Sequence, residues 1–318
     1  MKDLIINAIA TKEGYKSSPQ LRNSNYLETY YMNSYVSLYT AKLQNNNCDV
    51  MLITNAEVPS KFLELFENSE IKIKYQDFDC FNLSNEFSWA LAFYKLCALY
   101  HVANESEYDH YILLDTDTFV AKKLDELIYE IKDGGIMLYN IGHSYAHKDR
   151  KILIDNYQKN FGRSANIIHY GGELICGSKQ EIIKFMQECK IFFEKYTQTN
   201  TIDKTTGDEY IISAVASTAY NNIISAEPYI YRYWTGGFNL VSTNWKSNAR
   251  AIWHLPNEKE SGIILIFLYL QKHKNGITTS KAARLLGLPF GYMRISINNV
   301  KRRVGRRIIN LFYKKKWH

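Results

Sequence analysis

The stretch YILLDTDTFV, residues 111–120, places two carboxylates directly after a run of apolar residues. Residues 111–114 read as a buried strand. Asp115 and Asp117 follow, with Thr116 between them, and alternating side chains on an extended backbone point the same way. Carboxylates are costly at the end of an apolar strand unless a positive group meets them. The stretch therefore indicates either a site that holds a cation or a solvated turn in which an aspartate caps the next segment.

The segments before this stretch alternate between strand and helix patterns. The expected strands cover 4–10, 48–55, 71–78 and 110–115, and the expected helices cover 27–44, a short segment from Pro59, and 87–102. This alternation is typical of a parallel sheet covered by helices. Ligands of such sheets bind beyond the carboxyl ends of the strands. Asp115 and Asp117 lie at such an end.

The pattern after residue 120 is less regular. We expect a strand at 134–140, a strand, glycine turn and strand at 167–178, and helices at 150–160, 179–196, 208–219 and 258–273. Asp208 is expected to cap the third of these helices. The chain thus predicts one large α/β domain over 1–260 and a helical, basic C-terminal region over 261–318.

The excess positive charge of the chain lies at its C-terminus. Residues 301–318 contain eight lysines and arginines and no acid, so the chain's net charge of +7 leaves about −1 for all other residues. The cations alternate with apolar and aromatic residues. Such a segment suits an anionic membrane surface, a solvated tail, or nucleic acid together with a helix-turn-helix-like pattern at 278–299. We rank the membrane first and regard nucleic acid as the weakest alternative.

Cysteine usage and hydropathy bear on the compartment. The five cysteines, at 48, 80, 97, 176 and 189, form no CxxC pair. They indicate neither a zinc site nor a disulfide framework, and free thiols fit a reducing compartment. The start of the chain predicts no signal peptide, and the apolar run at 262–270 is too short to span a bilayer. We expect a cytoplasmic protein that rests on the inner face of the membrane through 301–318.

Two closely spaced carboxylates suit Mn²⁺ or Mg²⁺, especially when substrate phosphates complete the coordination shell. Two kinds of enzyme use such a pair. In a phosphatase of the haloacid-dehalogenase type, Asp115 would be the nucleophile, although Phe119 stands where that motif has Thr or Val. In a glycosyltransferase, the pair would hold a metal that neutralises a diphosphate leaving group.

Three segments resemble a GT-A fold glycosyltransferase, most closely the retaining family 8 type. They are the helix FSWALAFYKLCALY with the following strand and D-x-D, the segment HYGGELICGSKQEI at 169–182, and the late histidine segment IWHLPNEK at 252–259. The resemblance covers about residues 4–260. It implies a Rossmann-type mixed sheet flanked by helices and a donor that is a nucleotide sugar, UDP-linked in our expectation.

The resemblance also assigns roles to residues of this chain. Asp115, Asp117 and His254 would hold the metal, with a packed core histidine as the alternative for His254. Lys95 and Lys259 would face the diphosphate.

Other residues would line the donor and acceptor sites. The glycine turn at Gly171 and Gly172 would lie against the donor, with Glu173 nearby. Asp208 and Glu209 would line the sugar and acceptor site as catalytic carboxylates, although acids are also favoured at any helix N-terminus.

The end of the first strand is the expected nucleotide site. Ala10 ends this strand, Thr11 follows it, and Tyr15 in the next loop is the candidate for stacking on the base. The sequence therefore predicts a metal-dependent hexosyltransferase that uses a UDP-sugar, retains the anomeric configuration, and extends a glycan or lipid-linked glycan in bacterial surface polysaccharide synthesis. The alternatives are the phosphatase and a nucleic-acid-binding protein that acts through the C-terminal region.

Overall fold

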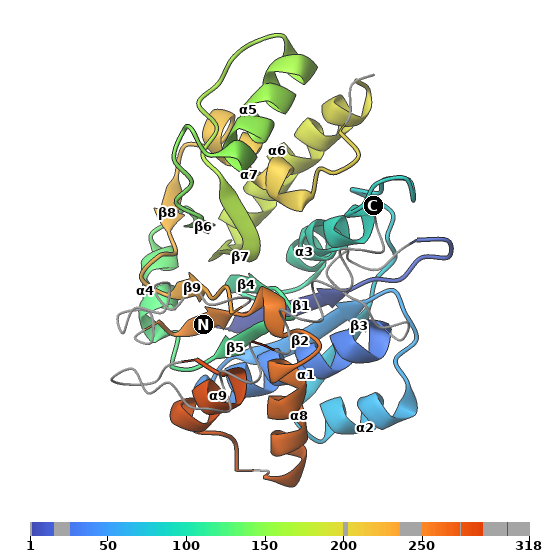
Figure 1. The fold of residues 1–318 in the computed structure, drawn as a ribbon, viewed down its shortest axis with the longest axis vertical. Helices are drawn as coiled ribbons and strands as arrows, with labels where there is room; N and C mark the ends of the chain where they lie inside the picture. Colours follow the sequence, from blue (N-terminus) through green and yellow to red (C-terminus); the bar gives the residue numbers. More distant parts are fainter. Residues whose placement is uncertain are drawn as a thin grey trace.

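The structure is a computed structural model that describes residues 2–15, 26–199, 203–235, 250–273, 275–288 and 304. In these residues, a seven-stranded sheet has the order β3-β2-β1-β4-β7-β6-β8 (Figure 1). Its strands are β1 (Asp3–Ile9), β2 (Asp49–Thr54), β3 (Ile71–Tyr75), β4 (His110–Leu114), β6 (Ile136–Asn140), β7 (Tyr170–Ser178) and β8 (Ile223–Ser225). The first four strands are parallel, whereas β7 pairs antiparallel with both β4 and β6. The mixed sheet predicted from the sequence is confirmed.

Helices cover both faces of this sheet. They are α1 (Tyr26–Gln44), α2 (Ser60–Glu67), α3 (Tyr94–Glu105), α4 (Asp125–Lys132), α5 (Lys148–Phe161), α6 (Lys179–Thr197), α7 (Asp208–Thr218), α8 (Gly262–Lys272) and α9 (Thr279–Leu286). One hydrophobic cluster joins α1, α2, α4, α8 and α9, and the other joins α3, α5, α6 and α7. Figure 1 shows α5, α6 and α7 at the upper end of the molecule and α1, α2, α8 and α9 at the lower end.

Strand β4 shows why the sequence forms this three-layer arrangement. Tyr111 and Leu113 belong to the cluster under α3, while Ile112 and Leu114 belong to the cluster under α1. Successive side chains of a strand point to opposite faces. A strand with helices on both faces must therefore be largely apolar, as YILL at residues 111–114 is.

A second, smaller sheet closes the carboxyl end of β4. It consists of β5 (Thr118–Val120), β10 (Ile252–His254) and β9 (Ile230–Arg232), in the order β5-β10-β9. In its register His254 lies opposite Thr118 on one side and Arg232 on the other. The small sheet thus brings residues far apart in sequence next to the D-x-D.

Four local expectations were wrong. The expected helix at 87–102 begins with a 3₁₀ turn, η1 (Ala90–Phe93), and becomes α-helical only at Tyr94. The glycines at 171–172 form no turn, because they lie inside the continuous strand β7. Gly207, not Asp208, is the N-cap residue of α7. The helix expected at 258–273 starts at Gly262, after a 3₁₀ turn, η4 (Pro256–Glu258).

The C-terminal region is described only in part. Helices α8 and α9 are present and pack on the core cluster under α1. The second helix of the helix-turn-helix-like pattern and the basic tail at 301–318 lie outside the described residues, apart from Val304. The division at residue 260 and the membrane contact of the tail stay predictions.

Candidate active site

The D-x-D carboxylates and the late histidine meet at the carboxyl end of β4. His254 Nε2 lies 3.3 Å from Asp117 Oδ2 and 3.8 Å from Asp115 Oδ2. One ligand atom from each of the three residues falls within 4.8 Å of the others. Asp117 and His254 are buried, while Asp115 is partly open to the cavity described below.

Two lysines supply positive charge to these carboxylates. Lys259 Nζ lies 2.7 Å from Asp117 Oδ2. Lys95, on α3, donates to Asp115 Oδ1 and lies 3.1 Å from Asp208 Oδ2, and it also donates to the Gly172 carbonyl at 3.1 Å. The carboxylates of the D-x-D are therefore paired with lysines from two separate segments.

The pKa values in this cluster follow from burial and charge. Burial opposes ionisation of Asp117, yet Lys259 and His254 hold its pKa well below the usual value. Burial would lower the pKa of His254, but Asp117 and Glu173 raise it to about 9. Burial raises the pKa of Asp208 to about 6, although Lys95 opposes the shift. In the metal-free protein, His254 thus serves as a cation at neutral pH.

A second ion-pair network adjoins the first. Arg232, on β9, makes a bidentate pair with Glu173 in which Nε lies 2.7 Å from Oε1, and its Nη2 lies 2.8 Å from Glu209 Oε1. Glu173 also lies 3.3 Å from His254 Nδ1. Glu209 Oε2 lies 3.1 Å from His169 Nε2. The network connects the D-x-D cluster with the first turn of α7.

The two glycines of β7 make room for these networks. A Cβ on Gly171 would stand 1.8 Å from Glu173 Oε2, and a Cβ on Gly172 would stand 2.2 Å from Asp208 Oδ2. These separations are far below any real contact distance, so no Cβ fits at either position. The charged groups lie directly against the backbone of the two glycines. The glycines therefore act through the absence of side chains and not through a turn.

A cavity of about 730 Å³ opens over this cluster. Ala8, Ile9 and Ala10 line it at the end of β1, together with Lys95, the two D-x-D carboxylates, Asp208, Glu209, His254 and Lys259. Its volume lies in the range of small-molecule sites. Thr11 and Tyr15 are not part of the lining. Thr11 bonds to Asn55, and the Tyr15 hydroxyl donates to the Leu83 carbonyl at 2.7 Å.

The donor set fits a hard divalent cation. Two carboxylates and one imidazole converge, and Mn²⁺ and Mg²⁺ prefer oxygen ligands with at most some imidazole nitrogen. In the metal-free protein Lys259 and His254 carry the compensating charge. A bound ion would supply this compensating positive charge at Asp117 instead.

Comparison with known proteins addresses the fold. No protein-family model and no curated protein matches the sequence. A crystal structure of an active-site mutant of LgtC, a family 8 glycosyltransferase, is similar with a TM-score of 0.51 and 11% sequence identity, over 79% of this chain and 86% of that one. The chain has a GT-A fold. At this identity the likeness shows architecture, and the chemistry rests on the residues described above.

Within this GT-A fold, sequence reasoning missed Arg232, His169 and His143. Arg232 lies in the aromatic strand YIYRYW, where a lone cation is a signal of a buried carboxylate partner. His143 Nδ1 lies 2.9 Å from His169 Nδ1, and its ring stacks on that of His147 with centroids 3.6 Å apart. Burial and neighbouring imidazoles lower the pKa of His143 to about 4. A neutral imidazole therefore lines this wall of the cavity.

Among the described residues, no helix is both long and apolar enough to cross a membrane. Helix α8, the most apolar segment of the sequence, packs one face against the core through Ile263, Ile266 and Leu270. Leu265 and Leu268 on its other side are exposed.

Proposed function

We propose that this protein is a metal-dependent glycosyltransferase that moves a hexose from a UDP-linked sugar to a glycan acceptor, with retention. The observation that carries the proposal is the convergence of Asp115, Asp117 and His254 on the floor of a cavity at the carboxyl ends of β1 and β4. The GT-A fold supports it. Bacterial surface polysaccharide synthesis, with a lipid-linked acceptor, is the setting that we propose from the basic tail.

Asp115, Asp117 and His254 would hold the ion, which supplies charge neutralisation for the diphosphate leaving group. Lys259 and Lys95 line the same cavity and add fixed positive charge there. Such charge stabilises the negative charge that grows on a leaving diphosphate. Ala10 marks the nucleotide end of the cavity, next to β1, and we keep Thr11 and Tyr15 as candidate contacts of the base.

Glu209 is suited to stabilise positive charge on the sugar. Its Oε1 contacts Arg232 and the Gly172 amide, and its Oε2 contacts His169. Burial would raise its pKa, but Arg232 and His169 keep the pKa well below normal. A carboxylate held by three partners is a weak nucleophile and a stable anion. We therefore favour electrostatic stabilisation by Glu209, with retention by a front-side route.

Asp208 differs from Glu209 in its pKa, which is raised and not lowered. Its pKa of about 6 allows the carboxyl to change charge near neutral pH. It lies on the cavity wall beside Lys95, where it can orient an acceptor hydroxyl and accept its proton. Asp208 is thus our candidate for the acceptor side.

Tryptophan fluorescence tests the proposal, because Trp89 and Trp234 line the cavity. We expect UDP to quench the fluorescence only when Mn²⁺ is present. Asp117→Asn should abolish the effect, and Asp125→Asn, at the exposed start of α4, should leave it intact. A screen of nucleotide sugars for metal-dependent hydrolysis then identifies the donor. Quenching that is indifferent to Mn²⁺, or phosphate release from a simple phosphomonoester, contradicts the proposal.

A further inference from the structure

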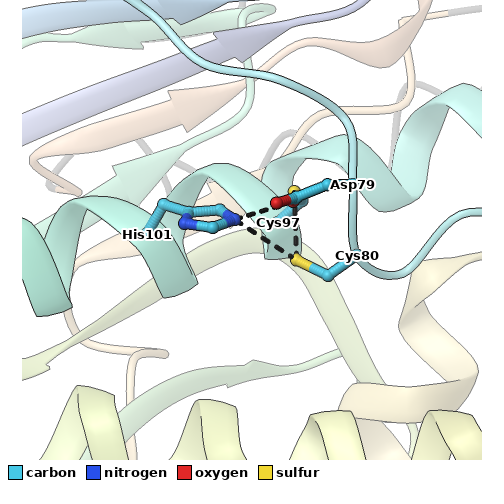
Figure 2. Close-up of side chains that lie close together, drawn as sticks. All are labelled: Asp79, Cys80, Cys97 and His101. Atoms are coloured by element: carbon cyan, nitrogen blue, oxygen red, sulfur yellow. Dashed lines mark hydrogen bonds and ion pairs between the residues drawn. The ribbon is translucent and has the colours of Figure 1, made fainter.

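A second group of potential metal ligands lies away from the cavity, beside α3. It consists of Asp79, Cys80, Cys97 and His101 (Figure 2). His101 Nε2 lies 2.7 Å from Asp79 Oδ1 and 3.8 Å from Cys80 Sγ. Cys97 Sγ lies 3.1 Å from Cys80 Sγ and 3.4 Å from Asp79 Oδ1. Figure 2 shows the four side chains pointing at one another.

The helical spacing explains why two of the four ligands lie close together. Cys97 and His101 are four residues apart on α3 and therefore share one face of the helix. Asp79 and Cys80 come from the segment between β3 and η1, which runs alongside α3. Two ligands on one turn of a helix and two on a neighbouring loop can together surround a single ion.

The other nitrogen of the histidine ring is also held. His101 Nδ1 lies 3.1 Å from Glu105 Oε1, and Glu105 Oε2 is paired with Lys74 Nζ at 2.6 Å. Histidines that bind metals through one nitrogen almost always bond the other to a carboxylate, carbonyl or water. The Glu105 contact therefore sets the ring with Nε2 toward the cysteines.

We propose that Asp79, Cys80, Cys97 and His101 form a structural Zn²⁺ site. Two thiolates, an imidazole and a carboxylate make a complete set of four protein ligands, as closed structural zinc sites require. Zinc bond lengths of about 2.0–2.3 Å imply ligand atoms roughly 3.3–3.8 Å apart in a tetrahedron. The four separations above span 2.7–3.8 Å, so shifts within about 1 Å seat an ion.

The ligand chemistry distinguishes this site from the D-x-D. Soft thiolates select Zn²⁺, whereas carboxylates suit Mn²⁺ and Mg²⁺. Both thiols lose their protons to solvent when the ion binds. The site is independent of the proposed transferase function, because none of its ligands lines the cavity.

The position of the site suggests what zinc does. Cys97 and His101 follow Lys95 on α3, and the loop that carries Asp79 and Cys80 continues to Ser88 and Trp89 on the cavity lining. An ion between loop and helix fixes both at one point. Loading with zinc is therefore expected to raise the thermal stability of the whole chain.

Metal analysis of the full-length protein tests the inference. Protein kept reduced with a phosphine should contain about one zinc per chain after dialysis. After removal of zinc, Co²⁺ should give the near-ultraviolet thiolate charge-transfer band with one equivalent. Cys80→Ser should lose at least half of the band's intensity, and His101→Gln, which keeps both thiolates, should require more Co²⁺ to develop the band. Glu105→Gln should keep it but weaken metal affinity by roughly ten- to a hundredfold.

Two variants serve as matched controls. Cys48→Ala removes a buried cysteine of the opposite core cluster, and Asp117→Asn removes a ligand of the first site. Both should retain the cobalt band, so a failed transferase assay does not affect this result. A chain that binds neither ion, a Cys80–Cys97 disulfide in protein purified under reduction, or an undiminished band in Cys80→Ser overturns the inference.

Discussion

Asp117 carries a buried negative charge that is stable only because of its neighbours. Its Oδ2 atom faces Lys259 Nζ at 2.7 Å and His254 Nε2 at 3.3 Å. Removing one partner of a buried ion pair leaves an uncompensated charge, which is costly. The residue that is proposed to bind the metal is therefore also a point where metal-free stability is vulnerable.

We expect Lys259→Ala to lower the free energy of unfolding by about 3 kcal/mol in the metal-free protein. Urea denaturation with a chelator present measures this. The matched control is Lys61→Ala, whose pair with Glu28 is largely exposed and should be worth less than about 1 kcal/mol. Mn²⁺ should restore part of the loss. Equal losses in the two variants would show that Asp117 does not depend on Lys259.

The pKa of His254 gives a pH dependence with a definite sign. Its folded-state pKa of about 9 lies above the unfolded value of 6.5. The stabilisation is fully present below about pH 6.5 and is lost as the pH rises through 9. Melting temperatures in chelator should fall over this window, and His254→Gln should flatten that part of the profile. An unchanged profile in the variant would assign the titration to another group.

At the scale of elements, β7 shows how the site depends on missing side chains. This strand lies between β4 and β6 and runs antiparallel to both. Charged side chains lie directly against its backbone at residues 171–172. Each added methyl would displace a carboxylate from its cation.

We expect Gly172→Ala to separate Asp208 from Lys95 and to reduce transfer activity strongly while the fold is retained. Gly207→Ala is a suitable control, because its Cβ would meet Trp89 only at an ordinary 3.7 Å. Circular dichroism and nucleotide-sugar hydrolysis, measured on both variants, separate folding from activity. Full hydrolysis by Gly172→Ala would contradict the tight approach seen here.

The elements also show what the sequence could reveal. The four parallel strands and the D-x-D were predictable because apolar runs and turns are local signals. The Gly171–Gly172 pair was misread as a turn, since only the fold shows that charged groups approach this backbone. Arg232 and the Cys80–Cys97 pair were missed for a related reason. Their partners come from other segments, and no spacing in the sequence records that contact.

At the scale of the whole molecule, the described part of the C-terminal region is packed on the core. Phe267 of α8 packs edge-on against Tyr35 of α1, with ring centroids 5.6 Å apart, and α9 continues the same cluster. Packing on the core therefore continues past residue 260, through α8 and α9.

We expect a chain that ends at residue 260 to lose cooperative unfolding. It would expose the surfaces of α1 and α2 that α8 covers, including Tyr35 on α1 and Phe62 on α2. Buried aromatic and aliphatic groups supply most of the stability of a core. Calorimetry of the 1–260 chain beside the full chain tests this. A sharp transition at the full-length temperature would make 1–260 an autonomous domain.

The closing strand β10 also has a consequence for biosynthesis. Asp117 leaves the ribosome long before His254 and Lys259, so the nascent chain holds an acid whose counter-charges do not yet exist. Native burial of that acid must wait for β10 and Lys259, so the pocket around Asp117 can form only after these residues have been made. Ribosome-stalled chains that end before residue 252 should therefore be protease-sensitive around the aspartate pair, whereas released chains should resist.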